Sequence, residues 1–440
     1  MLLWGVMISK LALFPVTAEI NYSGHLAVGG VDVTELAERY GTPLYVFDEA
    51  TIRARCRDFK REFSGRYQNT TAVYAGKAFL HGALAAVLNE EDFGLDVVSA
   101  GEMHIAESGG FPSERIYFHG NNKSVDELKM ALERRIGHIV VDNEYELELL
   151  AGLAAESGYI PQILLRITPG VDAHTHGHLT TGTVGSKFGI PLHRARAVIA
   201  RAMAITSLEL VGLHCHIGSM IDDVGPYLEA IDLMLGLAAE AGRECGFKLK
   251  ELDIGGGFGV RYILGAQVPD IELFAEGIVG RLSARCQDLE VPLPTLVIEP
   301  GRSIIAQAGF ALYRAGAVKE VDGHSYVAVD GGMTDNIRPA LYDARYEALS
   351  VGKAEAPESE RVTIVGRNCE SGDILIKQTM MAPVATGDLV AIPVCGAYCL
   401  PMSSNYNGVL KPAVVMVKDG ASRLIRHRET LQDLTRGDVV

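Results

Sequence analysis

The sequence predicts an α/β protein in which a (β/α)8 TIM-like barrel is joined to a C-terminal all-β domain. Three observations predict this fold class. The chain has 440 residues, which is too long for one small core and suits two or three domains, or fewer when one is a barrel. Between residues 71 and 301, short apolar runs alternate with amphipathic helical stretches. After residue 302 the helical periodicity fades and short β-like runs follow.

The repeated unit of the first region is a β-rich apolar run, a polar or glycine turn and a helical stretch, as in parallel strands joined by crossover helices. Eight units over about 230 residues match a barrel, and an open doubly wound sheet is the alternative. The predicted strands are Thr71–Tyr74, Gly94–Val98, Arg115–Phe118, His138–Val141, Gln162–Ile167, Leu208–His216, Leu249–Ile254 and Thr295–Glu299. Helical patterns include His81–Asn89, Val125–Arg135, Glu144–Glu156, Tyr227–Cys245 and Ile271–Cys286.

The second region carries β-like runs between turn residues, at Phe310–Val318, Ser325–Val329, Arg361–Val365, Leu389–Val394 and Ala413–Val417. The segment Ile20–Val31 has the pattern of a hairpin that joins this domain. We therefore expect a barrel domain over residues 40–303 and a β-domain made of residues 18–39 plus 304–440. Residues 1–17 are expected to form an apolar leader outside the structural core.

Composition narrows the class of function. The formal net charge is −15, and without a basic stripe the chain is not expected to bind nucleic acid. The seven cysteines are scattered without a CxxC pair, which fits a reducing compartment. The apolar stretch Met1–Thr17 is shorter than the roughly 18 residues of a membrane span and lacks the basic start of a secretory signal. We therefore expect a cytoplasmic protein with no membrane partner.

Every predicted barrel strand ends in polar or glycine residues, although the strand bodies are apolar. Catalytic groups of (β/α)8 barrels lie at the carboxyl ends of the strands, so this clustering predicts an active site there. The strand ends carry Ala75-Gly76-Lys77, Asp96 and Ser99, His119 and Asn121, Asp142 and Asn143, Arg166, His214 and His216, Gly255-Gly256-Gly257, and Glu299-Pro300-Gly301-Arg302.

Three of these groups point to one cofactor. Lys77 is either a surface lysine whose stem packs on apolar residues or an amine at the barrel mouth that forms a Schiff base. The glycines of Gly255–Gly259 form either a tight turn or a phosphate cradle, because backbone N–H groups can approach an anion there. Glu299 follows an apolar strand and needs a partner, either Arg302 or a protonated pyridine nitrogen. Together the three groups predict pyridoxal 5'-phosphate (PLP).

A metal centre is the competing interpretation. His174, His176 and His178 alternate along one segment, and His214 and His216 form an HxH pair at a strand end. Neutral imidazoles in such positions can bind zinc in a hydrolase. This interpretation leaves Lys77, the glycines and Glu299 without a role, so we predict no metal.

Ten ordered motifs resemble the fold-type III PLP-dependent decarboxylases, and among them the enzymes that act on meso-diaminopimelate. The resemblance extends from about Thr17 to the C-terminus and implies a barrel with a C-terminal β-domain. The motifs lie at Tyr40–Glu49, Tyr74–Phe79, Gly94–Glu102, Asp172–Gly182 with Ser186–Ile190, Gly212–Ser219, Asp253–Gly259, Glu299–Ser303, Arg338–Ala344, Cys369–Asp373 and Gly396–Asn407.

The resemblance implies a role for each member of the cofactor site. Lys77 would carry the Schiff base, His216 would stack on the cofactor ring, and Glu299 would contact the pyridine nitrogen. Four residues would bind the phosphate, and Asp96 completes the predicted cofactor site. The four phosphate residues are Ser219, Gly256, Gly257 and Tyr398.

The resemblance also implies a substrate site. Arg302, Arg338 and Tyr342 would hold the distal carboxylate of the substrate, Glu370 would contact its distal ammonium, and Tyr398 also belongs to this set. Cys369 would protonate the product carbanion. Cys369 and Glu370 would come from the partner subunit, so the implied assembly is a homodimer whose β-domain completes the active site and forms the dimer interface.

The implied reaction is PLP-dependent decarboxylation of meso-2,6-diaminopimelate to L-lysine and CO2, the last step of lysine biosynthesis, by a carboxy-lyase. Diaminopimelate presents a whole amino-acid head at its far end, which suits an arginine fork plus an acid. Two alternatives remain: a related decarboxylase acting on ornithine, lysine, arginine or carboxynorspermidine, and a non-catalytic binding protein of decarboxylase-like fold.

Overall fold

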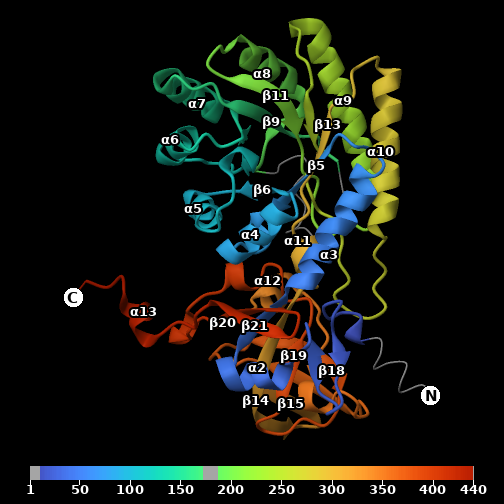
Figure 1. Cartoon of the computed structure of the whole chain (residues 1–440), viewed down its shortest axis with the longest axis vertical. Coiled ribbons are helices and arrows are strands. Elements are labelled where there is room, and N and C mark those ends of the chain that lie inside the picture. Colours follow the sequence, from blue (N-terminus) through green and yellow to red (C-terminus); the bar gives the residue numbers. More distant parts are fainter. Residues whose placement is uncertain (1–9, 172–186, 440) are drawn as a thin grey trace. The chain divides into compact units, whose positions relative to one another are not determined.

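The computed structural model describes residues 10–171 and 187–439, which form two compact units (Figure 1). We call residues 55–259 and 268–302 the barrel unit. The β-unit consists of the described residues up to 54, residues 260–267 and the residues from 303 onward. The predicted histidine stretch at 174–178 lies outside the described residues.

The barrel unit contains a closed ring of eight parallel strands, which confirms the predicted barrel. Hydrogen bonding runs around the ring from each strand to the next, and β8 pairs with β9 to close it. In sheet order the strands are β5 (Thr70–Ala75), β6 (Gly94–Val97), β7 (Ile116–Phe118), β8 (His138–Val141), β9 (Gln162–Thr168), β11 (Glu209–His214), β12 (Glu251–Asp253) and β13 (Thr295–Ile298). A short strand, β10 (Ile190–Pro191), pairs with β9 outside the ring.

A helix follows each strand of the ring in the sequence. The helices are α4 (Gly82–Glu90), α5 (Ala100–Ser108), α6 (Val125–Glu133), α7 (Glu144–Ser157), α8 (Leu192–Ala204), α9 (Gly225–Cys245), α10 (Ile271–Asp288) and the short α11 (Arg302–Ile305). Four of them begin at capping residues, since His81, Ser99, Ser124 and Asn143 accept hydrogen bonds from backbone N–H groups of the first turn. Some polar residues at strand ends therefore serve the helices rather than the site.

The interior of the ring is filled by side chains from six of its strands. Val73, Tyr117, Val140, Leu164, Val211 and Val297 form one buried cluster. Such a layer makes the barrel a packed core rather than a pore. It also fixes the strands that carry the polar groups at their ends.

The β-unit is rich in strands, as predicted. Its main sheet has the order β18 (Ile374–Met381), β17 (Glu360–Val365), β15 (His324–Val329), β14 (Gly309–Val321), β4 (Leu44–Asp48), β20 (Ala413–Lys418), β21 (Ala421–Arg426). Strand β19 (Leu389–Ile392) pairs with β14 and with β16 (Leu349–Ser350). A small antiparallel sheet joins β1 (Glu19–Ile20), β2 (Leu26–Val28) and β3 (Val31–Asp32). The helices α2 (Val33–Tyr40), α12 (Arg338–Tyr342) and α13 (Leu431–Thr435) complete the unit.

The contacts divide the chain differently from the expected boundaries. Strand β4 pairs with β14 and β20, so the β-unit extends to Ala54 instead of ending at residue 39, and α3 (Glu49–Phe59) runs across this boundary. Leu13 and Phe14 of the expected leader are each only 1% exposed, because Phe14 packs into the core of the β-unit with Phe310. That part of the leader therefore belongs to the core.

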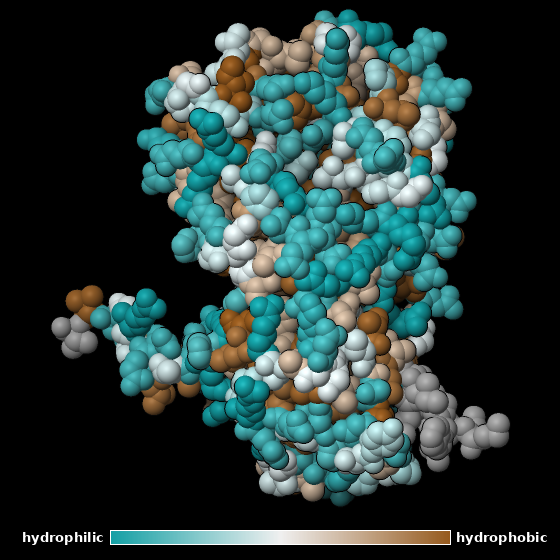
Figure 2. Space-filling view, viewed as in Figure 1, coloured by the Kyte–Doolittle hydropathy of each residue, from teal (hydrophilic) through white to brown (hydrophobic). Residues whose placement is uncertain are grey.

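The surface of the molecule is mainly hydrophilic on the side shown in Figure 2. On this face hydrophobic residues occur in small groups. Within the described residues, no helix is both long enough and apolar enough to cross a membrane.

Candidate functional site

The predicted Schiff-base lysine is an accessible amine at the carboxyl end of β5. Lys77 lies in a 3-10 turn (Gly76–Ala78) that follows the strand directly, and its side chain is 42% exposed. Its Nζ is 3.8 Å from Oδ2 of Asp96, which is buried at the end of β6. A Cβ at position 76 would overlap the carbonyl oxygen of Asp96, so glycine there lets the turn approach the neighbouring strand.

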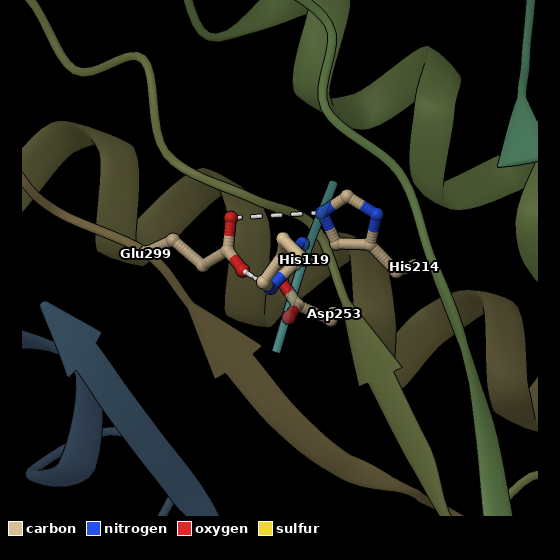
Figure 3. Close-up of side chains that lie close together, drawn as sticks. All are labelled: His119, His214, Asp253 and Glu299. Atoms are coloured by element: carbon tan, nitrogen blue, oxygen red, sulfur yellow. Dashed lines mark ion pairs between the residues drawn. The ribbon is translucent and has the colours of Figure 1, made fainter. Parts of the chain in front are cut away.

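Glu299 belongs to a buried polar cluster contributed by the ends of four strands of the ring, β7, β11, β12 and β13 (Figure 3). Its Oε1 is 2.8 Å from Nε2 of His119, and its Oε2 is 3.6 Å from Nε2 of His214. The rings of His119 and His214 meet edge to face. Asp253 is the fourth member, and one ligand atom from each residue lies within 4.8 Å of the others.

The electrostatics of this cluster keep Glu299 ionised. Burial alone would raise the pKa of Glu299, but the imidazoles of His119 and His214 outweigh it and hold that pKa well below the usual value. Burial, reinforced by the charge of Glu299, holds the pKa of Asp253 well above its usual range. Burial lowers the pKa of His214 to about 3, so at pH 7 this imidazole is neutral. The cluster therefore places an ionised carboxylate beside a second carboxyl group whose pKa is raised.

The triple glycine after β12 packs too closely for any side chain. A Cβ at Gly256 would overlap the carbonyl oxygen of Glu299, and one at Gly257 would overlap that of Gly218. Gly257 also has a φ of +107°, a conformation that favours glycine. The Gly256 N–H donates to Nδ1 of His216 at 3.3 Å. The glycines are therefore required by close backbone packing, and the N–H groups of Gly255 and Gly256 donate to Asp253 and His216.

Arg302 and Ser219 meet beside this loop. Arg302 Nη2 donates to Ser219 Oγ at 3.1 Å, and Ser219 directly follows Gly218, which contacts Gly257. Burial holds the pKa of His216 well below its usual value, so its ring is neutral. The eight predicted residues of the barrel unit are thus linked by contacts: Lys77, Asp96, His216, Ser219, Gly256, Gly257, Glu299 and Arg302.

A metal interpretation of the buried cluster has some geometric basis. His119, His214, Asp253 and Glu299 are types of residue that bind zinc, and within the described residues they form the one such group. The ion pair of Glu299 with His119, and the high pKa of Asp253, account for the closeness without an ion. Of the two described histidines in the competing metal interpretation, His214 belongs to this group and His216 does not.

Two predicted substrate residues lie in one short segment of the β-unit. Arg338 begins α12, and its guanidinium lies 4.6 Å from the ring centre of Tyr262 and 5.5 Å from that of Tyr346. Arg338 Nη1 also donates to the Tyr346 hydroxyl. Tyr342 is the last residue of the same helix and is partly exposed. Arg338 is thus a buried cation in contact with two aromatic rings, which themselves meet edge to face.

The predicted proton donor lies on an exposed loop of the β-unit. Cys369 and Glu370 are both exposed, and the Cys369 N–H donates to Oδ1 of Asn407 at 2.9 Å. The buried Asp373 accepts N–H bonds from Met333 and Asn368. Tyr398, by contrast, is partly buried and has a φ of +61°.

Several residues that contact the predicted site residues were not themselves predicted to belong to the site. His119 was noted only as a polar strand end, and Asp253 only as part of a motif. Tyr262 and Tyr346 were not singled out. Only the position of His119 after an apolar strand could have signalled its role, because its contact with Glu299 spans 180 residues of sequence.

Comparison with known proteins identifies the class. Residues 49–306, more than half of the chain, match the family model described as "Pyridoxal-dependent decarboxylase, pyridoxal binding domain". The chain belongs to this family of PLP-dependent decarboxylases, as the motifs predicted.

Individual relatives within the family carry a more specific name than the family model. A protein of Bacillus subtilis (strain 168) named diaminopimelate decarboxylase is 45% identical over 96% of this chain and 97% of its own length. A crystal structure of diaminopimelate decarboxylase from M. jannaschii in complex with L-lysine has a TM-score of 0.90, with 34% identity over 97% of this chain and 98% of that one. A second relative, from Bacillus methanolicus and of the same name, is 43% identical over 94% of this chain.

The residues of the barrel mouth fit the cofactor of this family. PLP requires an amine for its aldehyde, anion-binding groups for its phosphate and a carboxylate for its ring nitrogen. The barrel mouth offers the accessible amine of Lys77, the Gly256–Gly257 loop beside Ser219, and the ionised Glu299. Both buried oxygens of Asp96 form no hydrogen bond within the described part of the chain, which leaves acceptors at the mouth for a bound group.

Proposed function

We propose that this chain decarboxylates meso-2,6-diaminopimelate to L-lysine and CO2. The observation that carries the proposal is the ionised, buried Glu299 at the same barrel mouth as the amine of Lys77. The choice of substrate is supported by the relatives named diaminopimelate decarboxylase. Bound PLP supplies a conjugated pyridinium that accepts the electron pair left when CO2 departs.

The barrel residues bind and orient the cofactor in this proposal. Lys77 would supply the amine that binds the aldehyde of PLP, and Asp96 would orient that amine. Glu299 would keep the proton on the pyridine nitrogen, because an ionised carboxylate in a buried site stabilises a neighbouring cation. The neutral ring of His216 would contact the cofactor ring, and Ser219, Gly256, Gly257 and Tyr398 would bind the phosphate.

The far end of the substrate is assigned to Arg302, Arg338, Tyr342, Tyr398 and Glu370. The flat guanidinium of Arg338 suits a carboxylate, since its fork matches two oxygens. Arg302 gives one N–H to Ser219, and a guanidinium has five donors, so it can serve the substrate as well. Glu370 is exposed, and its carboxylate accepts hydrogen bonds from the distal ammonium of the substrate.

We further propose a homodimer in which Cys369 and Glu370 act in the active site of the partner subunit. Their exposure on a loop held by Asp373 and Asn407 supports this assignment. Cys369 donates the proton that replaces the lost carboxylate.

All seven cysteines are free in the structure, which supports a reducing compartment, the cytoplasm.

The test is lysine formation from meso-diaminopimelate with added PLP, beside parallel reactions with L-lysine, L-ornithine and L-arginine. We expect turnover of diaminopimelate alone and none in the Lys77→Ala variant, which lacks the amine. Turnover of ornithine, lysine or arginine instead would favour a related decarboxylase. Retained activity in Lys77→Ala would overturn the assignment of that lysine.

A further inference from the structure

We propose that His119, assisted by His214, is a positioning residue that fixes the Glu299 carboxylate for the pyridine nitrogen of the cofactor. This inference rests on the proposed function only in assigning Glu299 to that nitrogen. It adds a determinant of cofactor binding that lies outside the predicted site residues.

The geometry places His119 at the centre of the cluster. Its Nε2 lies 2.8 Å from Glu299 Oε1 and 3.9 Å from Asp96 Oδ1. His119 therefore bridges the carboxylate assigned to the ring nitrogen and the carboxylate that faces Lys77. Its side chain is only 6% exposed, so water cannot replace this contact.

Glu299 needs such a contact because of where it lies. A buried carboxylate without a cationic or N–H partner loses far more hydration than it regains. Of its two imidazole partners, His214 is the more distant, at 3.6 Å, and its edge-to-face packing on His119 holds the first ring in place. The pKa of Asp253 beside the same carboxylate is held well above its usual range, so this carboxyl group offers Glu299 no positive charge.

The same barrel provides a matched control. His138 is another buried histidine in contact with a glutamate, with its Nε2 3.1 Å from Glu251 Oε1. This pair lies at the amino ends of β8 and β12, away from Lys77 and the glycine loop. Replacing His138 removes the same chemical contact without touching the predicted cofactor site.

The experiment measures binding of two probes to the cofactor-free chain. The first is PLP, and the second is its 1-deaza analogue, in which a CH group replaces the ring nitrogen and offers nothing to Glu299. We expect His119→Phe to weaken PLP about tenfold, since a charge-assisted contact is lost, and to weaken deaza-PLP less than about twofold. His119→Gln, which keeps an N–H donor, should recover part of the PLP affinity. His138→Phe should change neither affinity.

The possible outcomes separate the inference from the proposed function. Equal weakening of both probes by His119→Phe would show a merely structural role and overturn the inference. The variant Glu299→Gln serves as the reference for the ring-nitrogen contact. If Glu299→Gln discriminates between the probes and His119→Phe does not, His119 does not act through Glu299. If Glu299→Gln itself fails to discriminate, the assignment of Glu299 under the proposed function is wrong, and the inference fails with it.

Discussion

The two histidine–glutamate pairs of the barrel interior differ in what surrounds them. At the amino ends of the strands, Glu251 is contacted by His138 at 3.1 Å and accepts a hydrogen bond from Tyr117 at 3.3 Å. The rings of Tyr117 and His138 stack with centres 4.2 Å apart. At the carboxyl ends, Glu299 is contacted by His119 and His214 but lies beside polar atoms that form no hydrogen bond within the described residues.

The difference shows how the same residue types can serve stability or function. The amino-end pair is partly open to water, with the Glu251 side chain 18% exposed, and both its carboxylate oxygens have partners within the chain. The carboxyl-end pair is buried and adjoins Asp96 and Asp253, whose pKa values burial raises. Unfavourable electrostatics of this kind are typical of active sites, where they are stabilised by a bound group.

The largest expected effect comes from replacing each of these two glutamates, in turn, with glutamine. Glu299→Gln removes the charge that holds a proton on the ring nitrogen, so we expect kcat/KM for diaminopimelate to fall about 100- to 1,000-fold. Glu251→Gln keeps the size of the side chain at the other end of the barrel, and we expect a change of less than about threefold. Steady-state rates of lysine formation measure both. An equal loss of kcat/KM in the two variants would show that the two pairs do not differ in function.

The next effect concerns Glu102, on the first turn of α5 after β6. Burial is the main cause that raises the pKa of Glu102 from 4.5 to about 7, with a further contribution from the Asp96 charge. Between pH 4.5 and 7 the folded state keeps a proton that the unfolded state releases, so stability falls as pH rises through this window. Glu102→Gln should therefore stabilise the protein at pH 8, by up to about 3 kcal/mol, and little near pH 4.5. Urea unfolding at the two pH values measures the difference.

Glu127 is the matched control for Glu102, because both follow a serine N-cap by three residues. Burial of Glu127 is outweighed by N–H donors of Ser124 and Ala100, which lower the pKa of its carboxyl. Its contribution is present above the unfolded pKa and is lost as pH falls. Glu127→Gln should thus destabilise at pH 8, by about 1 kcal/mol as for other cap contacts. If both variants shift stability in the same direction, the contrast between the two carboxylates is wrong.

The sequence predicted the barrel well because its signals are local. Each strand of the ring is a short apolar run followed by a turn and a helix, so periodicity alone locates all eight. Strands β18 and β21 were missed because ILIKQTMM and ASRLIR carry polar residues within them. Strand β4 was not predicted as a strand, and its motif Tyr40–Glu49 was assigned to the barrel, because its pairing with β14 and β20 depends on residues more than 260 positions away.

The residues of the candidate site also fall into two groups, those that local sequence signals predict and those that only distant contacts bring together. Lys77, the glycines and Glu299 could be predicted because each directly follows a strand and has a distinctive chemistry. The contact of His119 with Glu299 could not, because it depends on closure of the ring that brings the ends of β7 and β13 to one mouth. The contacts of Arg338 with the rings of Tyr262 and Tyr346 likewise join separate segments of the chain.

The smallest expected effect tests the amino-end cluster itself. Tyr117→Phe removes only the hydroxyl that donates to Glu251 Oε2 and leaves the stacking on His138 in place. Losing one hydrogen bond to a partly exposed carboxylate should cost about 1 kcal/mol of unfolding free energy, measured by urea unfolding. PLP affinity and kcat/KM should stay within about twofold of the parent chain, since the change lies at the opposite end of the strands from Lys77. A tenfold loss of cofactor affinity in this variant would mean that the two ends of the barrel are coupled, and the amino-end pair could then no longer be treated as purely structural.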